Sequence, residues 1–443
     1  MAPRSLHKLS ATEVAQLTRS GEITVEEYAR ALISRVQERD EVVRGWAYFD
    51  PDLIIASAKA LDAIPADRRG PLHGVAVGVK DVIHTKDMPT QHFSPIYKGD
   101  HPRVDASVVL TLRAAGALIF GKTHTTEFAT CQKGPPTCNP HDPKRSPGGS
   151  SSGSGAVVGD YQVPLSLGTQ TGGSTIRPGS YNGIFALKPT HNAISREGLK
   201  MYSITCDTVG LYSRSVDDLI LLTKVFRLKD DVPPPEQPLQ LSGAKFGFVK
   251  THVWPKAKPA VVSAWEQAKA LLTGAGAKVE EVDLDAEFDN MGEWHRNILH
   301  MEGQSSFLGD FLTSGDKLDP WVTKHVVNDT NTTRKEQLAS YDNIARLRPV
   351  IDAIASNYTA LITPSVTDEA PLIEEPMRFT GDASFNLMWT VLHLPVLNIP
   401  GFVGPNGLPV GLSLVTPRYT EESLLHTAQA VSVVFAKGGW QLD

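Results

Sequence analysis

A stretch rich in glycine and serine, residues 146–189, constrains this chain more than any other feature of its sequence. Such a composition by itself is typical of a flexible linker. Apolar segments at 156–158, 163–167 and 184–187 interrupt the stretch, however, and they look like core elements. Glycine between core segments commonly marks a close approach of two backbones or a residue with positive φ. We therefore expect two turns, GGSSSGSG and TQTGGS, that face each other at one edge of a sheet.

Apolar runs alternate with helical patterns along the rest of the chain, which predicts an α/β fold on a mostly parallel sheet. Strands are expected at 74–79, 117–120, 245–249, 278–282, 360–363 and 412–415, and helices at 106–115 and 260–272. Asn406 and Gly407 lie between two apolar runs, which is typical of a tight hairpin. The hairpin makes the expected sheet mixed.

The N-terminal residues 1–60 are predicted to be helical, with capping boxes that start at Ser10 and Thr24. Residues 233–235 are consecutive prolines and indicate a surface linker, but neither half of the chain looks complete alone. We therefore expect one domain over residues 1–443. Its parts are N-terminal helices, a catalytic core and a second half of the sheet with substrate-shaping loops, at 1–60, 70–225 and 240–443 respectively.

The polar stretch from Ser314 to Glu336 has weak periodicity and is predicted to be a loop-rich insertion. Insertions of this kind often shape a pocket. An inert excursion on the surface is the alternative, and the sequence does not choose between them.

Residues Gly116–Thr123, GALIFGKT, have the spelling of a phosphate-binding loop. Such a loop needs its strand before the first glycine and a flexible turn between the two glycines. Here the four residues between the glycines are themselves the predicted strand. We interpret the match as accidental.

Residues Gly149–Gly153, GSSSG, have the spelling of the nucleophile elbow of α/β-hydrolases, which would make Ser151 the nucleophile. That motif requires a strand directly before the turn, and residues 141–147, HDPKRSP, do not have a strand pattern. The elbow is kept as a catalytic alternative. The 14 histidines include no HxxxH or HExxH pair, so no metal site is predicted.

Ser174 follows two glycines, and Lys80 ends a buried apolar run. A serine hydroxyl is a weak nucleophile until a base removes its proton. A buried lysine can lose its charge and serve as that base. Two successive glycines leave backbone amides free to converge on an oxyanion. These residues predict serine hydrolysis with an uncharged lysine.

The motifs around these residues closely resemble those of the amidase signature family. The matching segments are Gly78-Val79-Lys80-Asp81, Gly148-Gly149-Ser150-Ser151, Thr171-Gly172-Gly173-Ser174 and Lys188-Pro189-Thr190. Flanking sequences in the same order extend the resemblance over nearly the whole chain. It implies a single α/β/α domain around a large mixed sheet, an amidase activity and no cofactor.

The resemblance implies a Ser–Ser–Lys triad. Ser174 would form the acyl-enzyme, and Ser150, on a cis peptide bond, would relay a proton between Ser174 and Lys80. The spacing to Ser174 is the family's spacing, and it selects Ser150 from three adjacent serines. Ser151 would support this network through hydrogen bonds. The backbone amides implied for the oxyanion hole are those of Thr171, Gly172, Gly173 and Ser174.

Several positions depart from the common family pattern. Gln170 stands in place of aspartate, Asn182 stands in place of cysteine, and Arg177 lies three positions after the nucleophile instead of two. A branch that includes malonamidase-like enzymes has a similar TQTGGS sequence and shifted arginine. Arg177 is expected either to bind a substrate carboxylate or to form a structural ion pair. The candidate substrate-binding residues are Gln170, Arg177, Cys131 and Thr125, with His124 beside them.

Composition limits the partners. A net charge of −6 argues against a nucleic-acid-binding surface, and no run approaches the roughly 20 apolar residues that span a membrane. The N-terminus lacks the apolar core of a signal peptide, and the three cysteines form no CxxC pair. We expect a cytoplasmic protein with a small-molecule amide substrate, no nucleic-acid or membrane partner, and a homodimer as a candidate assembly.

The leading hypothesis is an independent amidase that hydrolyses linear amides, with carbamates and esters as related substrates. The alternative from another functional class is the glutaminase component of a tRNA-amidating complex, which has the same fold and triad. A binding protein without activity is disfavoured because all three triad residues are present.

Overall fold

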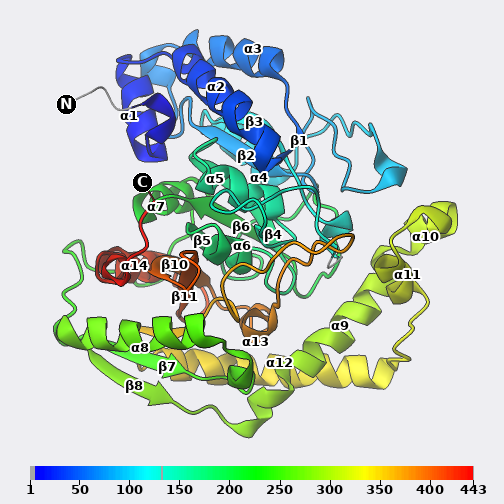
Figure 1. Ribbon diagram of the computed structural model, residues 1–443, viewed down its shortest axis with the longest axis vertical. Coiled ribbons are helices and arrows are strands. Elements are labelled where there is room, and N and C mark those ends of the chain that lie inside the picture. The colour runs from blue at the N-terminus through cyan, green and yellow to red at the C-terminus, as the bar shows by residue number, and fades with distance from the viewer. Residues whose placement is uncertain (1–4, 131–132, 443) are drawn as a thin grey trace.

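The apolar runs of the sequence form buried strands in the computed structural model, which describes residues 5–130 and 133–442. Eleven strands within these residues join in one sheet (Figure 1). In spatial order they are β1 (Trp46–Tyr48), β3 (Leu118–Thr123), β2 (Ala76–Lys80), β4 (Leu165–Gln170), β6 (Thr208–Ser213), β5 (Phe185–Lys188), β10 (Val396–Val403), β11 (Pro409–Val415), β9 (Ala360–Pro364), β7 (Lys245–Val249) and β8 (Lys278–Val282).

The sheet is mixed, as the sequence predicted. Strand β2 pairs in parallel with β3 and β4, and β7 pairs in parallel with β8 and β9. The pairs between these two groups are antiparallel, and so is β1 with β3. The hairpin between β10 and β11 contains Gly407 at a φ of 78°, which glycine adopts without strain. The α/β fold class is confirmed.

Helices alternate with these strands and pack against the sheet. Within the described residues they are α1 (Ala11–Ser20), α2 (Val25–Val43), α3 (Pro51–Asp62), α4 (Ser107–Ala114), α5 (Ser152–Gly159), α6 (Ile176–Tyr181), α7 (Val216–Val225), α8 (Pro259–Gly274), α9 (Met291–Ser306), α10 (Leu308–Ser314), α11 (Pro320–Val326), α12 (Arg334–Ala355), α13 (Ser384–Val391) and α14 (Glu421–Phe435). Both predicted capping boxes are present, at Ser10 and Thr24.

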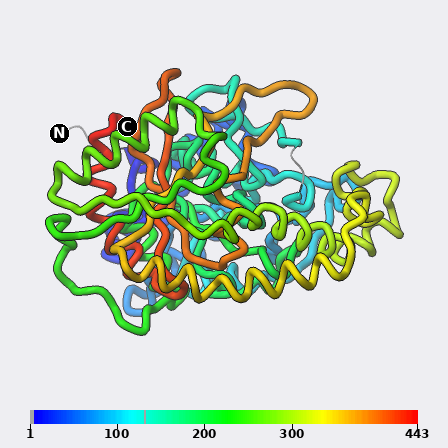
Figure 2. Tube along the Cα trace, turned by 90° about the horizontal axis from the view of Figure 1, so that it is seen from below, coloured from blue at the N-terminus to red at the C-terminus, as the bar shows by residue number. Residues whose placement is uncertain are grey.

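Strands from both halves of the chain share the sheet, so the hydrophobic core crosses the proline linker at 233–235. Helices α9 and α12 pack side by side, and α10 and α11 lie at the outer end of this pair. Figure 2 shows this group projecting to one side of the molecule. The finer division into residues 1–60, 70–225 and 240–443 stays a prediction.

The expectation of a loop-rich insertion from Ser314 to Glu336 is wrong. This stretch contains α11 and the start of α12, and a 3₁₀ turn at Gly315–Lys317 follows α10. Local signals explain the helices, because Asp319 caps α11 with Pro320 at its first position and Thr333 begins a capping box with Glu336. The periodicity of apolar residues in this stretch is weak, so the sequence pattern did not indicate these helices.

The phosphate-loop spelling at Gly116–Thr123 lies mostly on a strand. Residues 118–123 form the buried strand β3, so the segment between the glycines is extended and is not a flexible turn. A Cβ atom at Gly121 would come within 2.8 Å of the Trp46 ring. The glycine therefore serves packing, which confirms that the match is accidental.

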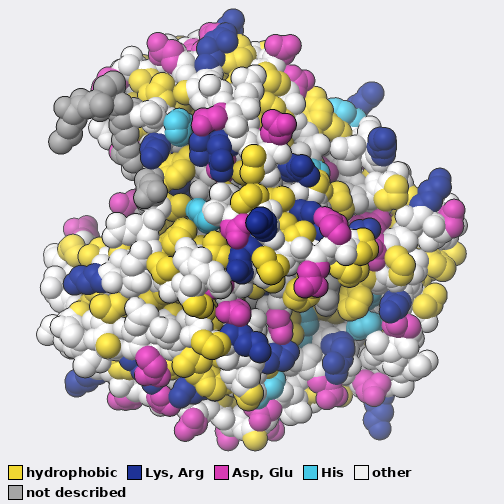
Figure 3. Space-filling model, in the orientation of Figure 1, with side chains coloured by type: hydrophobic (Ala, Val, Ile, Leu, Met, Phe, Trp, Pro, Cys, Tyr) yellow, Lys and Arg dark blue, Asp and Glu magenta, His cyan; other side chains and the backbone are white. Residues whose placement is uncertain are grey.

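The surface and the thiols add three observations. Figure 3 shows a face on which basic and acidic side chains are interspersed, without a broad region of either sign. No helix in the described part of the chain is long and apolar enough to cross a membrane. Cys138 and Cys206 are buried free thiols, whereas Cys131 lies outside the described residues.

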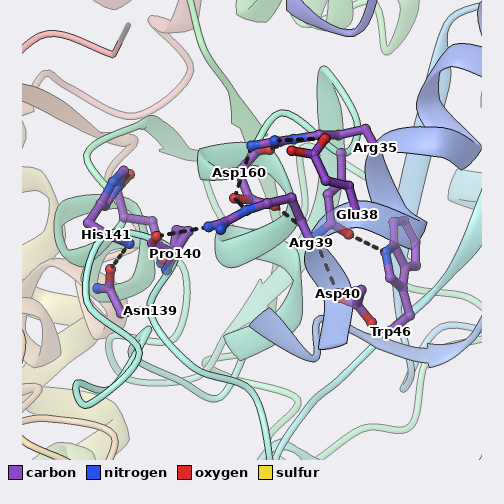
Figure 4. A network of polar contacts seen from close by, with 11 residues as sticks. Arg35, Glu38, Arg39, Asp40, Trp46, Asn139, Pro140, His141 and Asp160 are labelled. Carbon is purple, nitrogen blue, oxygen red and sulfur yellow. Dashed lines mark hydrogen bonds and ion pairs between the residues drawn. The ribbon is translucent and has the colours of Figure 1, made fainter. Parts of the chain in front are cut away.

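A polar network fastens α2 to the segment between α5 and β4 (Figure 4). The buried carboxylate of Asp160 accepts hydrogen bonds from Arg35 at 3.3 Å and from Arg39 at 3.0 Å. The indole of Trp46 donates to Gln162 Oε1 at 2.6 Å. Since α5 carries the turn with the candidate Ser150 at its N-terminus, this network stabilises the framework behind the site.

We expect Asp160→Asn to lower the free energy of unfolding by about 3 kcal/mol, because it leaves two arginines without their buried anion. Urea denaturation of the purified chain measures this loss. Glu287→Gln is the matched control, since Glu287 pairs with Arg346 at 3.0 Å on the surface, where an ion pair contributes about 1 kcal/mol or less. Equal losses in the two variants would contradict the assigned role of the Asp160 network.

Candidate active site

The carboxyl ends of two neighbouring strands define the site. Strand β2 ends at Lys80 and β4 ends at Gln170, and because the two strands are parallel their ends reach the same edge of the sheet. The turn with Ser174 follows β4, and the turn with Ser150 precedes α5. A cavity of about 470 Å³ opens here, and both serines line it.

Lys80 is fully buried, and its amine is hydrogen-bonded to two hydroxyl groups. Its Nζ lies 2.8 Å from the Oγ of Ser150 and 2.7 Å from the Oγ1 of Thr169. Burial lowers the pKa of Lys80 well below its ordinary value, the positive charge of Arg177 lowers it further, and the carboxylate of Asp207 opposes the shift. An amine in this setting can be uncharged and can accept a proton.

The peptide bond between Gly149 and Ser150 is cis, as the family resemblance implied. The guanidinium of Arg177 donates hydrogen bonds to the carbonyls of Gly149 and Gly381. Arg177 also lines the cavity. Its two terminal nitrogens therefore hold backbone on two sides of the site.

Ser151 lies behind the cavity and is completely buried. Its hydroxyl donates to the carbonyl of Thr169 at 3.1 Å and lies 3.2 Å from the amide of the same residue, which donates to it. Ser151 thus fixes the end of β4, next to the hydroxyl that contacts Lys80. No strand occurs in the described residues 141–150, so the nucleophile elbow, which needs a strand there and an exposed Ser151, is contradicted.

The turn Thr171–Ser174 forms part of the cavity wall. The hydroxyl of Thr171 donates to Asp207 at 2.6 Å, and the other oxygen of Asp207 accepts from the amides of Tyr202 and Ser203. Burial raises the pKa of Asp207 to about 6. These contacts fasten the first residue of the turn to the neighbouring loop.

The remaining candidate residues lie outside the cavity lining or outside the described chain. Gln170 is buried behind the turn, where its Oε1 accepts from the amides of Thr175 and Ile176 at the start of α6. Thr125 is buried and donates to the carbonyl of Thr126, and His124 also lies apart from the cavity. The side chain of Gln170 therefore points into the interior, where it caps α6, and it does not line the cavity. Cys131 lies outside the described residues.

The second half of the chain supplies another wall of the cavity. Its members that the sequence did not single out include His295, Leu299, His300, Trp321, His325 and Leu387. They come from α9, α11 and α13, so the stretch predicted to be loop-rich does reach the pocket. No motif could have identified them, because they lie more than 100 positions after the turn in the sequence; His295, for example, contacts the carbonyl of Thr171 across 124 positions.

Neutral rings line part of this wall, together with charged side chains such as Arg296. The Nδ1 of His325 donates to the carbonyl of Trp321 at 2.7 Å, so its Nε2 accepts the hydroxyl hydrogen of Tyr202 at 2.6 Å. Burial lowers the pKa of His325 to about 4, and its ring stacks on His300 with 4.5 Å between centroids. At neutral pH this part of the cavity offers flat, uncharged surfaces.

Comparisons with known proteins agree with this geometry. The sequence model of the family described as Amidase matches residues 27–425. A glutamyl-tRNA(Gln) amidotransferase subunit from Symbiobacterium thermophilum is 32% identical over 96% of both chains. The protein of the same name from Acidothermus cellulolyticus is 37% identical over 97% of this chain and 95% of its own.

Solved structures share the fold. The native peptide amidase from Stenotrophomonas maltophilia superposes with a TM-score of 0.80 at 26% identity, covering 97% of each chain. The family match spans most of the described sheet and includes all the motifs of the candidate site. This chain therefore belongs to the Amidase family.

Proposed function

We propose that this protein hydrolyses a carbon–nitrogen amide bond through an acyl-enzyme on Ser174, with Ser150 as proton relay and Lys80 as general base. One observation carries the proposal: the buried Nζ of Lys80 lies 2.8 Å from the Oγ of Ser150. Burial favours the neutral amine that a base requires.

In the acylation step, the Oγ of Ser174 attacks the amide carbon while its proton passes to Ser150 and the proton of Ser150 passes to Lys80. The carbonyl oxygen becomes an oxyanion, which the backbone amides of residues 171–174 stabilise. The proton then returns from Lys80 through Ser150 to the leaving nitrogen, and the carbon–nitrogen bond breaks. A water molecule hydrolyses the acyl-enzyme by the same relay and restores Ser174.

The substrate is less constrained than the chemistry. The neutral rings of Tyr202, Trp321 and His325 favour an uncharged amide of small or medium size. Arg177 remains a candidate contact for a substrate carboxylate, although backbone carbonyls already engage its guanidinium.

A second candidate function is that of the glutaminase component of a tRNA-amidating assembly, in which the amide would be glutamine. The names of the curated relatives favour it, because relatives at 30–37% identity over 96–97% of this chain are called glutamyl-tRNA(Gln) amidotransferase subunits. This function uses the same residues and the same first step. It differs in needing partner proteins and in the fate of the ammonia.

Ammonia release by the purified chain separates the two candidates. Rapid turnover of simple primary amides, anilides, carbamates or esters by the lone chain supports the independent amidase. Turnover of L-glutamine that requires co-purifying proteins from a native extract supports the tRNA-amidating assembly. The substrate panel also ranks amides against esters, which the cavity alone does not rank.

Ser174→Ala should abolish turnover, because it removes the atom that forms the acyl-enzyme. A fluorophosphonate probe should label the wild type at Ser174, as peptide mass spectrometry can show, and should leave Ser174→Ala unlabelled. Ser151→Ala is the comparison variant and should still be labelled. Unchanged labelling of Ser174→Ala would remove Ser174 from the mechanism.

Lys80→Met should lower kcat for amides at least about 100-fold, the contribution typical of a positioned base. Esters should lose less, since their leaving group hardly needs the returned proton. Lys278→Met is the control, because Lys278 is exposed at the start of β8. Equal loss for amides and esters would exclude proton return by Lys80.

Amide turnover of the wild type should fall as the pH falls. The pKa of Lys80 is lowered, so the amine is uncharged above that pKa and gains a proton as the pH drops through it. The measurement is kcat/KM between pH 9 and pH 5 with a neutral amide. A rate that rises as the pH falls contradicts a lysine base.

A further inference from the structure

Two side chains from the second half of the chain bind successive carbonyls of the Thr171–Ser174 turn. The Nε2 of His295, on α9, lies 2.9 Å from the carbonyl oxygen of Thr171. The hydroxyl of Thr390, on α13, lies 2.7 Å from the carbonyl oxygen of Gly172. Both side chains are buried. Sequence motifs place neither residue in the site.

Because the peptide group is planar, these two contacts also fix the directions of the N–H groups of Gly172 and Gly173. In a trans peptide the C=O and the following N–H point in opposite directions. The hydrogen bond from His295 to the Thr171 carbonyl therefore turns the amide of Gly172 away from α9. The hydrogen bond from Thr390 to the Gly172 carbonyl likewise turns the amide of Gly173 away from α13.

We propose that His295 and Thr390 are positioning residues that orient the backbone amides of Gly172 and Gly173 toward the oxyanion. The inference rests on the proposed function, because it needs an oxyanion at this turn. It adds that the preorganisation of the oxyanion hole comes from α9 and α13, which pack against each other and lie below the strand edge in Figure 1.

The orientation of each donor follows from its partners. A carbonyl oxygen only accepts hydrogen bonds, so the Nε2 of His295 carries the hydrogen. Burial lowers the pKa of His295 to about 4, which keeps the ring neutral at neutral pH. The constraint therefore adds no charge next to the nucleophile and does not vary with pH above 5.

Gln170 determines the direction of the Thr390 hydroxyl. The Nε2 of Gln170 donates to the Oγ1 of Thr390 at 3.0 Å, so the single hydroxyl hydrogen points elsewhere. It has two acceptors, the carbonyl of Gly172 at 2.7 Å and the carbonyl of Asn386 at 3.0 Å. A carboxylate at position 170 would instead accept that hydrogen and release Gly172. The departure from aspartate at this position thus fits the proposed constraint.

The rate at which a fluorophosphonate labels Ser174 tests the proposal without knowledge of the substrate. In this reaction the Ser174 oxygen bonds to phosphorus, the P–F bond breaks with release of fluoride, and the proton leaves through Ser150. Negative charge develops on the phosphoryl oxygen, which occupies the place of the oxyanion. Thr390→Val, which is nearly isosteric, and His295→Leu should each slow labelling about tenfold, less than the loss of a direct donor.

Conservative variants and a distant control distinguish a positioning role of His295 and Thr390 from a role in packing alone. Thr390→Ser and His295→Gln keep an N–H or O–H donor and should recover most of the rate. Thr223→Val is the control, because it removes a buried hydroxyl that donates to a carbonyl on α7, away from the cavity. Wild-type labelling rates in both Thr390→Val and His295→Leu would overturn the proposal. So would equal impairment of His295→Leu and His295→Gln.

Steady-state kinetics supply the second readout. With the best amide of the substrate panel, Thr390→Val should lower kcat and leave KM nearly unchanged, since the oxyanion forms only in the transition state. A change confined to KM would assign Thr390 to substrate binding and overturn the inference. The proposed function fails by a different result, which is labelling that survives Ser174→Ala.

Discussion

The burial of one lysine amine among hydroxyl groups is the interaction on which the rest of the site depends. Lys80 ends strand β2, and its Nζ contacts Ser150 and Thr169. An amine without an ion-pair partner loses its proton more easily as it leaves water, and this makes it a base. The surrounding arrangement maintains that condition, because Ser151 holds the end of β4 and the carboxylate of Asp207 is engaged with Thr171.

The site is assembled from two halves of the chain, and neither half is sufficient. The first half carries the lysine, the serines and the glycine turn on the ends of β2 and β4. The second half supplies the cavity wall from α9 and α11 and the hydrogen bonds of His295 and Thr390 to the turn. The continuous sheet, which joins β5 to β10, gives the two halves a common core. The proposed chemistry thus depends on packing between segments that are far apart in the sequence.

The departures from the common family pattern acquire a physical meaning in this arrangement. Gln170 caps α6 with its oxygen and binds Thr390 with its nitrogen, which a carboxylate could not do in both directions. Asn182 donates to the carbonyls of Pro147 and Pro178, below the turn that carries Ser150. Arg177 holds the carbonyl next to Ser150. These departures concern the support of the turns that carry Ser150 and Ser174.

The sequence by itself determined the fold class, the positions of several strands and helices, and the segments that carry Lys80, Ser150 and Ser174. It could do so because these depend on local periodicity and on glycine-rich turns at fixed spacing. The tertiary structure decided which residues face the cavity. Gln170 and Thr125 lie outside the cavity lining, and helices occupy much of the stretch 314–336 where a loop was expected. His295 and Thr390 contact the turn. Side-chain orientation at a strand end and contacts across 124 or 218 positions depend on packing, which no local pattern encodes.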